Sequence, residues 1–337
     1  MSCRRTAAQN DINLRRPGLL RPVCGDFFTV AALPWFMPVP KKIRNFAALI
    51  MNNDRKILVT GCNGQLGCEL RSLLGERAVY VDREDLDLTD RDAVERFMRI
   101  GDFAYVVNCA AYTAVDRAEE EKLACSQANV DIVENLGRPA EELDYRIIHI
   151  STDYVFDGHS WRPYNESDKP EPLSVYGSTK RRGETALLGL APGSMIIRTG
   201  WLYSSYGHNF VKTILEHGRK GAGLRVVADQ IGTPTYAADL AAFIVNNVID
   251  GHWTPGIFNY SGEGVASWYD FAVAILEEAG ISARVTPIST DEYPTAAERP
   301  LFSVLDKSKV KAVYGITLPH WRSSLREAIK KIMQTNG

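Results

Sequence analysis

Three side chains in the middle of the chain have the types and spacing needed to pass a proton to a carbonyl oxygen. Thr152 ends an apolar run, and Tyr176 and Lys180 lie four residues apart in PLSVYGSTK. On a helix that spacing places both side chains on one face. A phenol of ordinary pKa, about 10, is a weak proton source, and we expect the neighbouring ammonium to lower the pKa of Tyr176. The pattern predicts Tyr176 as proton donor and Thr152 as the group that orients the carbonyl, although an isolated YxxxK is also common in ordinary helices.

A glycine-rich turn precedes this set in ILVTGCNGQLGCEL. Gly61, Gly64 and Gly67 lie between an apolar run and a helical pattern, where glycine permits a tight turn and close approach of a pyrophosphate. Asp82 follows twenty-one residues after Gly61, at a position suited to binding the ribose hydroxyls of a dinucleotide. A plain structural turn is the alternative interpretation. An acid here favours NADH, but the adjacent Arg83 could neutralise the 2′-phosphate of NADPH, so both cofactors stay open.

The elements that must position these residues alternate between short apolar runs and amphipathic stretches. The runs are rich in Val and Ile, and we predict buried strands at 56–60, 78–82, 105–110, 146–151 and 194–199. Between them the periodicity predicts helices at 65–75, 90–100, 118–143 and 174–190. This alternation predicts an α/β fold, a Rossmann-type doubly wound parallel sheet covered by helices on both faces.

The pattern becomes looser beyond residue 200. Helices are expected at 208–219, 236–249, 267–279 and 321–334, separated by short strands such as 224–228 and 256–260. We interpret residues 51–200 as a dinucleotide-binding domain and residues 201–337 mainly as a smaller C-terminal α/β substrate-binding domain.

The first fifty residues differ in composition from the rest. They hold eight Lys or Arg against two Asp, and the apolar stretch that begins near residue 27 is broken by prolines, unlike a secretory signal. Met51 directly precedes the first predicted strand. We therefore interpret residues 1–50 as a non-native or disordered extension.

Composition narrows the classes of partner. A net charge of -2 gives no reason to expect nucleic acid, and no apolar run of membrane-spanning length occurs. The six cysteines show neither a CxxC pair nor the spacing of a disulfide framework, and the six histidines show no metal-ligand spacing. These features predict a cytoplasmic protein whose partners are small molecules or protein, with no metal site.

Eight segments together resemble one family. VTGCNGQLG, NCAAYTAVDRAE, ISTDYVFDG, VYGSTKRRGE, RTGWLY, NF, DQIGTPTYAADLA and ERPLFSVLD follow one another as in dTDP-4-dehydrorhamnose reductases, a branch of the extended short-chain dehydrogenases/reductases. The resemblance runs from about Lys56 to the C-terminus. It implies reduction of the 4-keto group of dTDP-4-dehydro-L-rhamnose by NADPH or NADH, giving dTDP-L-rhamnose for polysaccharide synthesis.

The resemblance also implies roles for individual residues. Thr152, Tyr176 and Lys180 match the catalytic positions, and Lys180 would also hold the nicotinamide ribose. The other positions implied to bind the cofactor are Gly61, Asn63, Gly64, Gln65, Leu66, Gly67, Asp82, Asp87, Leu88, Ala110, Ala111 and Tyr112. Thr152, Asp153 and Trp201 match sugar-contacting positions, although Trp201 could instead be a core aromatic. Arg299 is a candidate for the substrate diphosphate or for a surface role, and Asn129 could brace the site or be merely solvated.

The sequence leaves alternatives for the oligomeric state and for the exact reaction. Some family members dimerise through a magnesium ion, and Glu69 matches one ligand, but Ala237 and Ala238 stand where a glutamate would be expected. We therefore predict no metal and leave a homodimer open. Dehydratases of this fold carry an Asp-Glu pair after the threonine, whereas Tyr154 follows Asp153 here. A reductase or epimerase of another nucleotide sugar, and a non-catalytic regulatory subunit like that of methionine adenosyltransferase, are the alternatives.

Overall fold

The computed structural model describes residues 55–221 and 223–335. The predicted extension at residues 1–50 lies outside these ranges. Every predicted site residue lies within them.

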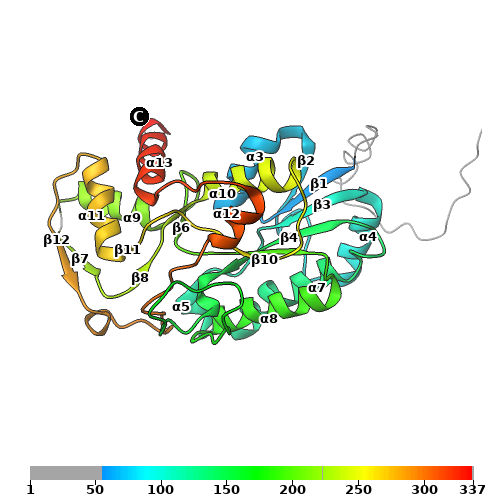
Figure 1. The fold of residues 1–337 in the computed structure, drawn as a ribbon, viewed down its shortest axis with the longest axis horizontal. Coiled ribbons are helices and arrows are strands. Elements are labelled where there is room, and N and C mark those ends of the chain that lie inside the picture. The colour runs from blue at the N-terminus through cyan, green and yellow to red at the C-terminus, as the bar shows by residue number, and fades with distance from the viewer. Residues whose placement is uncertain (1–54, 222, 336–337) are drawn as a thin grey trace, which may run out of the picture. The chain divides into compact units, whose positions relative to one another are not determined.

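A six-stranded sheet is the main element of the described chain (Figure 1), and all of its pairings are parallel. Its strands in spatial order are β2 (Ala78–Val81), β1 (Lys56–Thr60), β3 (Phe103–Asn108), β4 (Arg146–Thr152), β5 (Met195–Thr199) and β10 (Gly256–Asn259). The chain order reverses between β1 and β3. The carboxyl ends of strands at such a switch point form the usual ligand crevice of an open α/β sheet.

Helices cover both faces of the sheet, as predicted for parallel strands (Figure 1). On one face, apolar side chains of the strands share a buried core with α3 (Gln65–Leu74), α10 (Ala237–Phe243), η4 (Ile244–Ile249) and α12 (Ser308–Tyr314). On the other face lie α4 (Arg91–Gly101), α7 (Ile132–Gly137) and α8 (Val175–Leu190), of which α7 contacts the other two. Ile57 and Val59 belong to the first core, whereas the fully buried Leu58 between them does not, as the two-residue period of a strand requires.

A second buried core lies in the C-terminal part of the chain. Its helices are α9 (Phe210–Arg219), α11 (Trp268–Glu278) and α13 (Trp321–Thr335). Three two-stranded sheets accompany them: β7 (Leu224–Val227) with β12 (Val285–Ile288), β8 (Ile231–Gly232) with β11 (Ala266–Ser267), and β6 (Leu202–Tyr203) with β9 (Thr235–Tyr236). Three short 3-10 helices occur in the described residues: η1 (Gly75–Arg77), η3 (Asp153–Val155) and η5 (Thr290–Glu292).

Two predicted elements differ from the structure. The helix expected over 118–143 begins as α5 (Val115–Ala118), restarts as α6 (Lys122–Ser126) and passes through a π-helical turn, η2 (Gln127–Asp131), before α7 ends at Gly137. The strand expected at 256–260 was assigned to the C-terminal part, but β10 pairs with β5 and completes the central sheet. The domain boundary at residue 200 stays a prediction.

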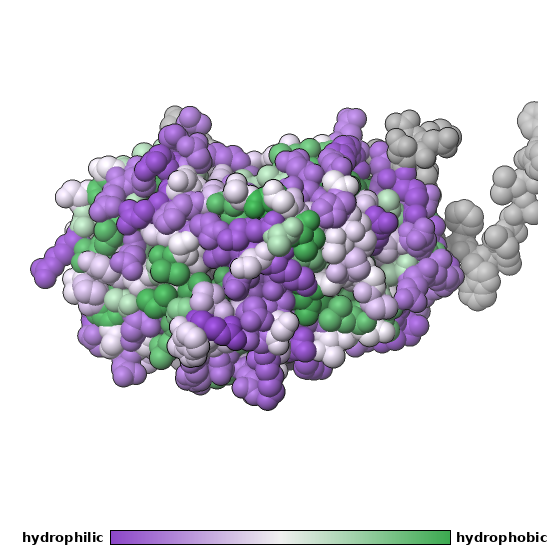
Figure 2. Space-filling model, viewed as in Figure 1, coloured by the Kyte–Doolittle hydropathy of each residue, from purple (hydrophilic) through white to green (hydrophobic). Residues whose placement is uncertain are grey.

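None of the helices described over 55–221 and 223–335 combines the length and apolar character needed to cross a membrane. The face drawn in Figure 2 is mainly hydrophilic, with hydrophobic residues in scattered patches.

Candidate active site

The glycine turn between β1 and α3 is shaped by close backbone contacts. Gly61 has φ +61°, and a Cβ there would lie 2.7 Å from the backbone nitrogen of Ala110 after β3. A Cβ on Gly67 would lie 2.5 Å from the carbonyl oxygen of Gly61. Both positions therefore require glycine, one for the turn and one for packing helix on strand. The cradle at the start of α3 fits a dinucleotide pyrophosphate, which helix N-termini bind through backbone N–H groups.

Asp82, directly after β2, is hydrogen-bonded to this turn. Its carboxylate accepts hydrogen bonds from the backbone N–H of Asn63 at 2.9 Å and of Arg83 at 2.8 Å. Further along, hydrogen bonds from Thr89 hold the pKa of Asp87 below its usual range. Leu88 is buried, and its carbonyl oxygen accepts from Asn135. These contacts fix the second strand's loop beside the glycine turn.

A cleft of about 1000 Å³ opens along the carboxyl edge of the sheet. Its walls include most of the residues predicted for cofactor and substrate: Gly61, Gly64, Gln65, Leu66, Gly67, Asp82, Asp87, Leu88, Ala110, Ala111, Tyr112, Thr152, Asp153, Tyr176, Lys180 and Trp201. Arg83 also lines it. Asn63 and Arg299 do not. The structure thus gathers the glycine turn and the proton-transfer residues in one cavity, while their individual roles stay predictions.

The proton-transfer residues come from β4 and α8. Thr152 is the last residue of β4, and its hydroxyl donates to Asp153 Oδ1 at 3.1 Å and interacts with the phenol of Tyr176. Ser174 caps α8 by accepting from the backbone N–H of Gly177, which fixes the first turn that carries Tyr176. Lys180 is almost fully buried and donates to the carbonyl oxygen of Ile150 at 2.6 Å.

Burial governs the ionisation of these groups. It raises the pKa of Tyr176 to about 12, against a smaller lowering by the hydrogen bond with Thr152. The prediction that Lys180 lowers the pKa of Tyr176 is therefore wrong for this structure, since the Lys180 ammonium is directed to Ile150. Burial also lowers the pKa of Lys180 to about 8 and raises that of Asp153 to about 6. Tyr176 consequently keeps its proton throughout the neutral range.

Trp201 has an unusual backbone for its type. It adopts φ +49° directly after β5, and its ring stacks on Trp268 with centroids 3.5 Å apart. On another side the ring packs so closely on Gly232 that a Cβ there would lie 2.4 Å from it. Both tryptophans line the cleft, so Trp201 is held rigidly where it faces the cavity. Its predicted sugar contact is compatible with this position.

Arg299 lies outside the main cleft. It lines a second cavity of about 470 Å³, which shares Trp268 with the first. The guanidinium forms two hydrogen bonds with Asp116 of α5, at 3.0 and 2.7 Å, and these hold the pKa of Asp116 below its usual range. The observed partner of Arg299 is therefore a carboxylate, and a contact with the substrate diphosphate stays a prediction.

Several residues support the site although the sequence left their role open or gave no sign of it. Asn129 is fully buried in the π-turn, where it accepts from the backbone N–H of Tyr112 and donates to Thr179 Oγ1, so the bracing interpretation holds and the solvated one is wrong. Trp268 and the buried His149, which lies 3.4 Å from the Lys180 nitrogen, carried no recognisable signal. Their partners are distant in sequence.

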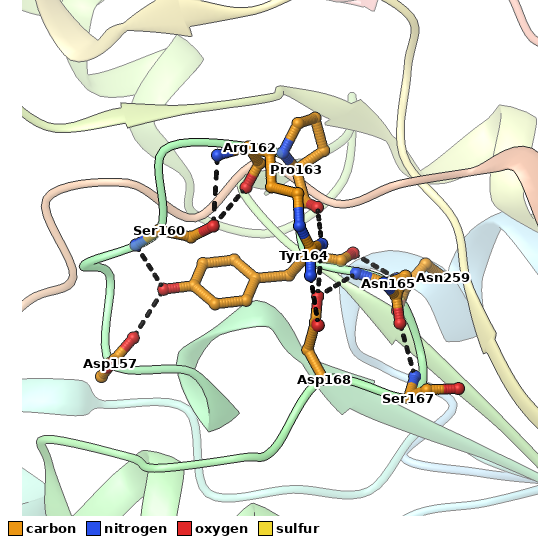
Figure 3. A network of polar contacts seen from close by, with 9 residues as sticks. All are labelled: Asp157, Ser160, Arg162, Pro163, Tyr164, Asn165, Ser167, Asp168 and Asn259. Carbon is orange, nitrogen blue, oxygen red and sulfur yellow. Dashed lines mark hydrogen bonds and ion pairs between the residues drawn. The ribbon is translucent and has the colours of Figure 1, made fainter.

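The segment between Asp153 and α8 is anchored by a polar network (Figure 3). The phenol of Tyr164 donates to Asp157 and accepts from the backbone N–H of Ser160, and Arg162 pairs with Asp168. Asn259 of β10 donates to the carbonyl oxygen of Tyr164 at 2.8 Å. The last strand of the sheet therefore supports the loop that leads from Thr152 to Tyr176.

Glu69 of α3, the position compared with a magnesium ligand, has protein partners. It is buried and accepts from Ser204 at 2.6 Å and from Lys331 at 3.0 Å. Within residues 55–221 and 223–335, no three His, Cys, Asp or Glu side chains gather in a way that could hold a metal ion.

A doubly wound parallel sheet, a glycine turn at its switch point and a Thr-Tyr-Lys set in the adjoining cleft define a protein of the short-chain dehydrogenase/reductase class. The family model described as RmlD substrate binding domain matches residues 55–334. The chain belongs to this family, that of the dTDP-4-dehydrorhamnose reductases.

Relatives and solved structures agree with the family. A dTDP-4-dehydrorhamnose reductase of Aggregatibacter actinomycetemcomitans is 42% identical, over 80% of this chain and 97% of the relative. A crystal structure of such a reductase from Clostridium acetobutylicum is similar, with a TM-score of 0.80 and 40% identity over 82% of this chain and 99% of that one. A reductase from Bacillus anthracis, solved in complex with NADP, has a TM-score of 0.79 and 34% identity, covering 82% and 99%.

Proposed function

We propose that this chain reduces the 4-keto group of dTDP-4-dehydro-L-rhamnose to give dTDP-L-rhamnose, with NADPH or NADH as reductant. The observation that carries the proposal is the gathering of Thr152, Tyr176 and Lys180 at the carboxyl edge of the sheet, in the same cleft as the glycine turn. The cofactor supplies the hydride to the carbonyl carbon. The product would serve polysaccharide synthesis, and we place the enzyme in the cytoplasm. A homodimer stays open.

The chain's own residues would bind the reactants and deliver the proton. The turn from Gly61 to Gly67 and Asp82 would hold the dinucleotide, with Lys180 at its nicotinamide ribose. Thr152 would orient the carbonyl oxygen by a hydrogen bond. Tyr176, protonated because its pKa is about 12, would give its proton to that oxygen as the carbonyl is reduced.

The test is a Tyr176→Phe variant of the full chain. We expect binding of the dinucleotide to be retained and turnover to fall by about 10²–10⁴-fold, since only the proton donor is removed. Oxidation of dTDP-L-rhamnose with NADP⁺ or NAD⁺, followed by absorbance of the reduced nicotinamide, measures the reverse reaction with a stable sugar. Wild-type turnover in Tyr176→Phe would contradict the assignment of the donor. A wild-type chain inactive with this sugar in both directions would contradict the proposed reaction.

Cofactor preference is tested at Arg83, which lines the cleft beside Asp82. An arginine here can pair with a 2′-phosphate, which only NADPH carries. We expect Arg83→Ala to lower kcat/KM for NADPH by about tenfold and to leave that for NADH unchanged. Steady-state kinetics with both cofactors measure this, and an equal effect on both would remove Arg83 from phosphate recognition.

A further inference from the structure

A buried row of polar side chains leads from Lys180 across three strands of the central sheet. His149 of β4, Asn108 of β3 and Thr60 of β1 are backbone neighbours in the parallel register. The row joins Thr60 Oγ1 to Asn108 Oδ1 at 2.7 Å, Asn108 Nδ2 to His149 Nδ1 at 3.1 Å, and His149 Nε2 to Lys180 Nζ at 3.4 Å. All four residues are at most 2% exposed. Of these four residues, the mechanism described above uses only Lys180.

The surroundings fix the orientation of the Asn108 amide. Its Oδ1 accepts from the backbone N–H of Ala110 at 3.2 Å, as well as from Thr60. A backbone N–H can only donate, so the atom facing it must be the amide oxygen. The amide NH₂ therefore faces His149 Nδ1, which must accept.

His149 consequently has one available tautomer. Burial, together with the nearby Lys180, lowers the pKa of His149 well below its usual value, so the ring is neutral. A neutral imidazole with an accepting Nδ1 carries its proton on Nε2. That N–H points toward the nitrogen of Lys180.

The contact discriminates between the two forms of Lys180. An ammonium has three donors and no acceptor, whereas a neutral amine has a lone pair that can accept from Nε2–H. The other ionisable neighbours of Lys180 oppose this effect, because they raise its pKa and favour the ammonium. They are Glu184 on α8, Cys109 after β3 and Cys125 on α6. Tyr176, on the same helix face, is neutral throughout this range.

We propose that His149 is a positioning residue: its Nε2–H, fixed by Asn108, disfavours the ammonium form of Lys180 and thereby sets the upper pH limit of turnover. The inference rests on the proposed function, in which Lys180 holds the nicotinamide ribose beside Tyr176, and it assigns that role to the ammonium form. Activity then falls as Lys180 loses its proton. Burial already lowers the pKa of Lys180 to about 8, and the contact with His149 Nε2–H acts in the same direction.

The first test compares kcat/KM against pH for wild type, His149→Gln and His149→Leu. Glutamine can turn its carbonyl oxygen toward Lys180 and accept from the ammonium, so the alkaline limb should move up by about one pH unit. Leucine removes the Nε2–H donor of His149 without supplying an acceptor, so the alkaline limb of the His149→Leu profile should move up by less. A limb at the wild-type pH in both variants, even with lower kcat, would reduce His149 to a packing residue and overturn the proposal.

If His149→Leu does not fold, Asn108→Asp provides a second way to shift the pH at which kcat/KM falls on the alkaline side. The carboxylate would accept from His149 Nδ1–H, leaving Nε2 as an acceptor for the ammonium. We expect the alkaline limb to move upward here too. An unchanged limb in this variant contradicts the proposed role of the tautomer.

A third measurement needs no turnover. In wild-type protein carrying ¹³C-labelled histidine, the ring carbons of His149, assigned by their loss in His149→Gln, should report the Nε2–H tautomer. They should also shift with pH as Lys180 titrates. An Nδ1–H tautomer would overturn the inference whether or not the chain is a reductase, whereas an inactive chain with the Nε2–H tautomer would contradict only the proposed function.

Discussion

Single side chains show why burial outweighs charge in this cleft. Sequence spacing alone predicts that an ammonium one helical turn away will lower the pKa of a phenol. In the folded chain Tyr176 is enclosed and its pKa rises, because desolvation disfavours the phenolate and Lys180 is held by Ile150. The raised pKa keeps the proton on Tyr176 at neutral pH, but it also makes the phenol a weaker acid than one of ordinary pKa.

Gly61 provides a prediction about the glycine turn. Alanine there would require φ near +61° and would place Cβ 2.7 Å from the backbone of Ala110. We expect Gly61→Ala to destabilise the fold by about 1–3 kcal/mol and to weaken dinucleotide binding, because the turn must move. Urea unfolding and isothermal titration with NADP⁺ measure the two effects.

Gly189 of α8 is the matched control. Apart from its chain neighbours and the backbone of its own helix, no atom lies within 4 Å of a Cβ built there, and its φ is not positive. Gly189→Ala should leave stability unchanged or raise it by up to about 1 kcal/mol, as expected inside a helix. Equal effects of the two substitutions would show that the conformation of Gly61 is not required.

The residues of the site were predictable where chemistry depends on type and spacing. Thr152, Tyr176 and Lys180 form a recognisable set, and the structure brings them together in one cleft. Arg299 was not predictable in the same way, because its partner Asp116 lies on α5, far earlier in the sequence. His149 was equally hidden, since only the register of β3 and β4 places it beside Asn108.

Among the elements, α8 depends on a buried ion pair. Glu184 accepts two hydrogen bonds from Arg198 of β5, at 2.8 and 2.7 Å, and one from Ser151 of β4 at 2.6 Å. These contacts connect the helix that carries Tyr176 and Lys180 to the two strands beneath it. Removing one member leaves the other charge uncompensated in the interior.

We therefore predict that Glu184→Gln destabilises the chain by about 3–5 kcal/mol. Burial alone would raise the pKa of Glu184, but the bonds from Arg198 hold it below its usual value of 4.5. A lowered carboxyl pKa stabilises the fold above the unfolded-state value, so this contribution is lost as the pH falls below about 4.5. Urea unfolding at neutral and acidic pH measures both. Glu216→Gln is the control and should change little, because Glu216 of α9 pairs with Lys220, just beyond the helix, and both side chains are exposed.

The interruption at η2 shows what periodicity cannot predict. The amphipathic pattern over 118–143 is continuous enough to suggest one helix. The π-turn instead rotates Asn129 inward, where it bonds the backbone of Tyr112 from the loop after β3. Such turns often occur at functional positions, and their cause lies in tertiary contacts.

For the molecule as a whole, the N-terminal stretch can be tested directly. The family match begins at residue 55, and the cores described above are built from residues that follow it. We expect residues 51–337 alone to fold and to retain the melting temperature and kcat/KM of the full chain. A truncated chain that failed to fold would show that residues 1–50 are required.

The parallel α/β class was predictable because each crossover leaves its own helical pattern between two apolar runs. The position of the last strand was not. A four-residue strand such as Gly256–Asn259 carries no signal of its partner, and it is separated from β5 by helices of both cores. The central sheet therefore includes a pairing between strands much farther apart in the sequence than the pattern of runs and helices suggests.

That late strand has a consequence during biosynthesis. When the ribosome has released β5, the edge of this buried Met195–Thr199 strand that faces away from β4 has no neighbour until Gly256–Asn259 is also made. At about 5–20 residues per second, this interval lasts several seconds. A strand edge with unpaired backbone N–H and C=O groups can recruit a strand from another nascent chain. Synonymous codons that slow translation between residues 200 and 255 should therefore lower the soluble yield without altering the purified enzyme.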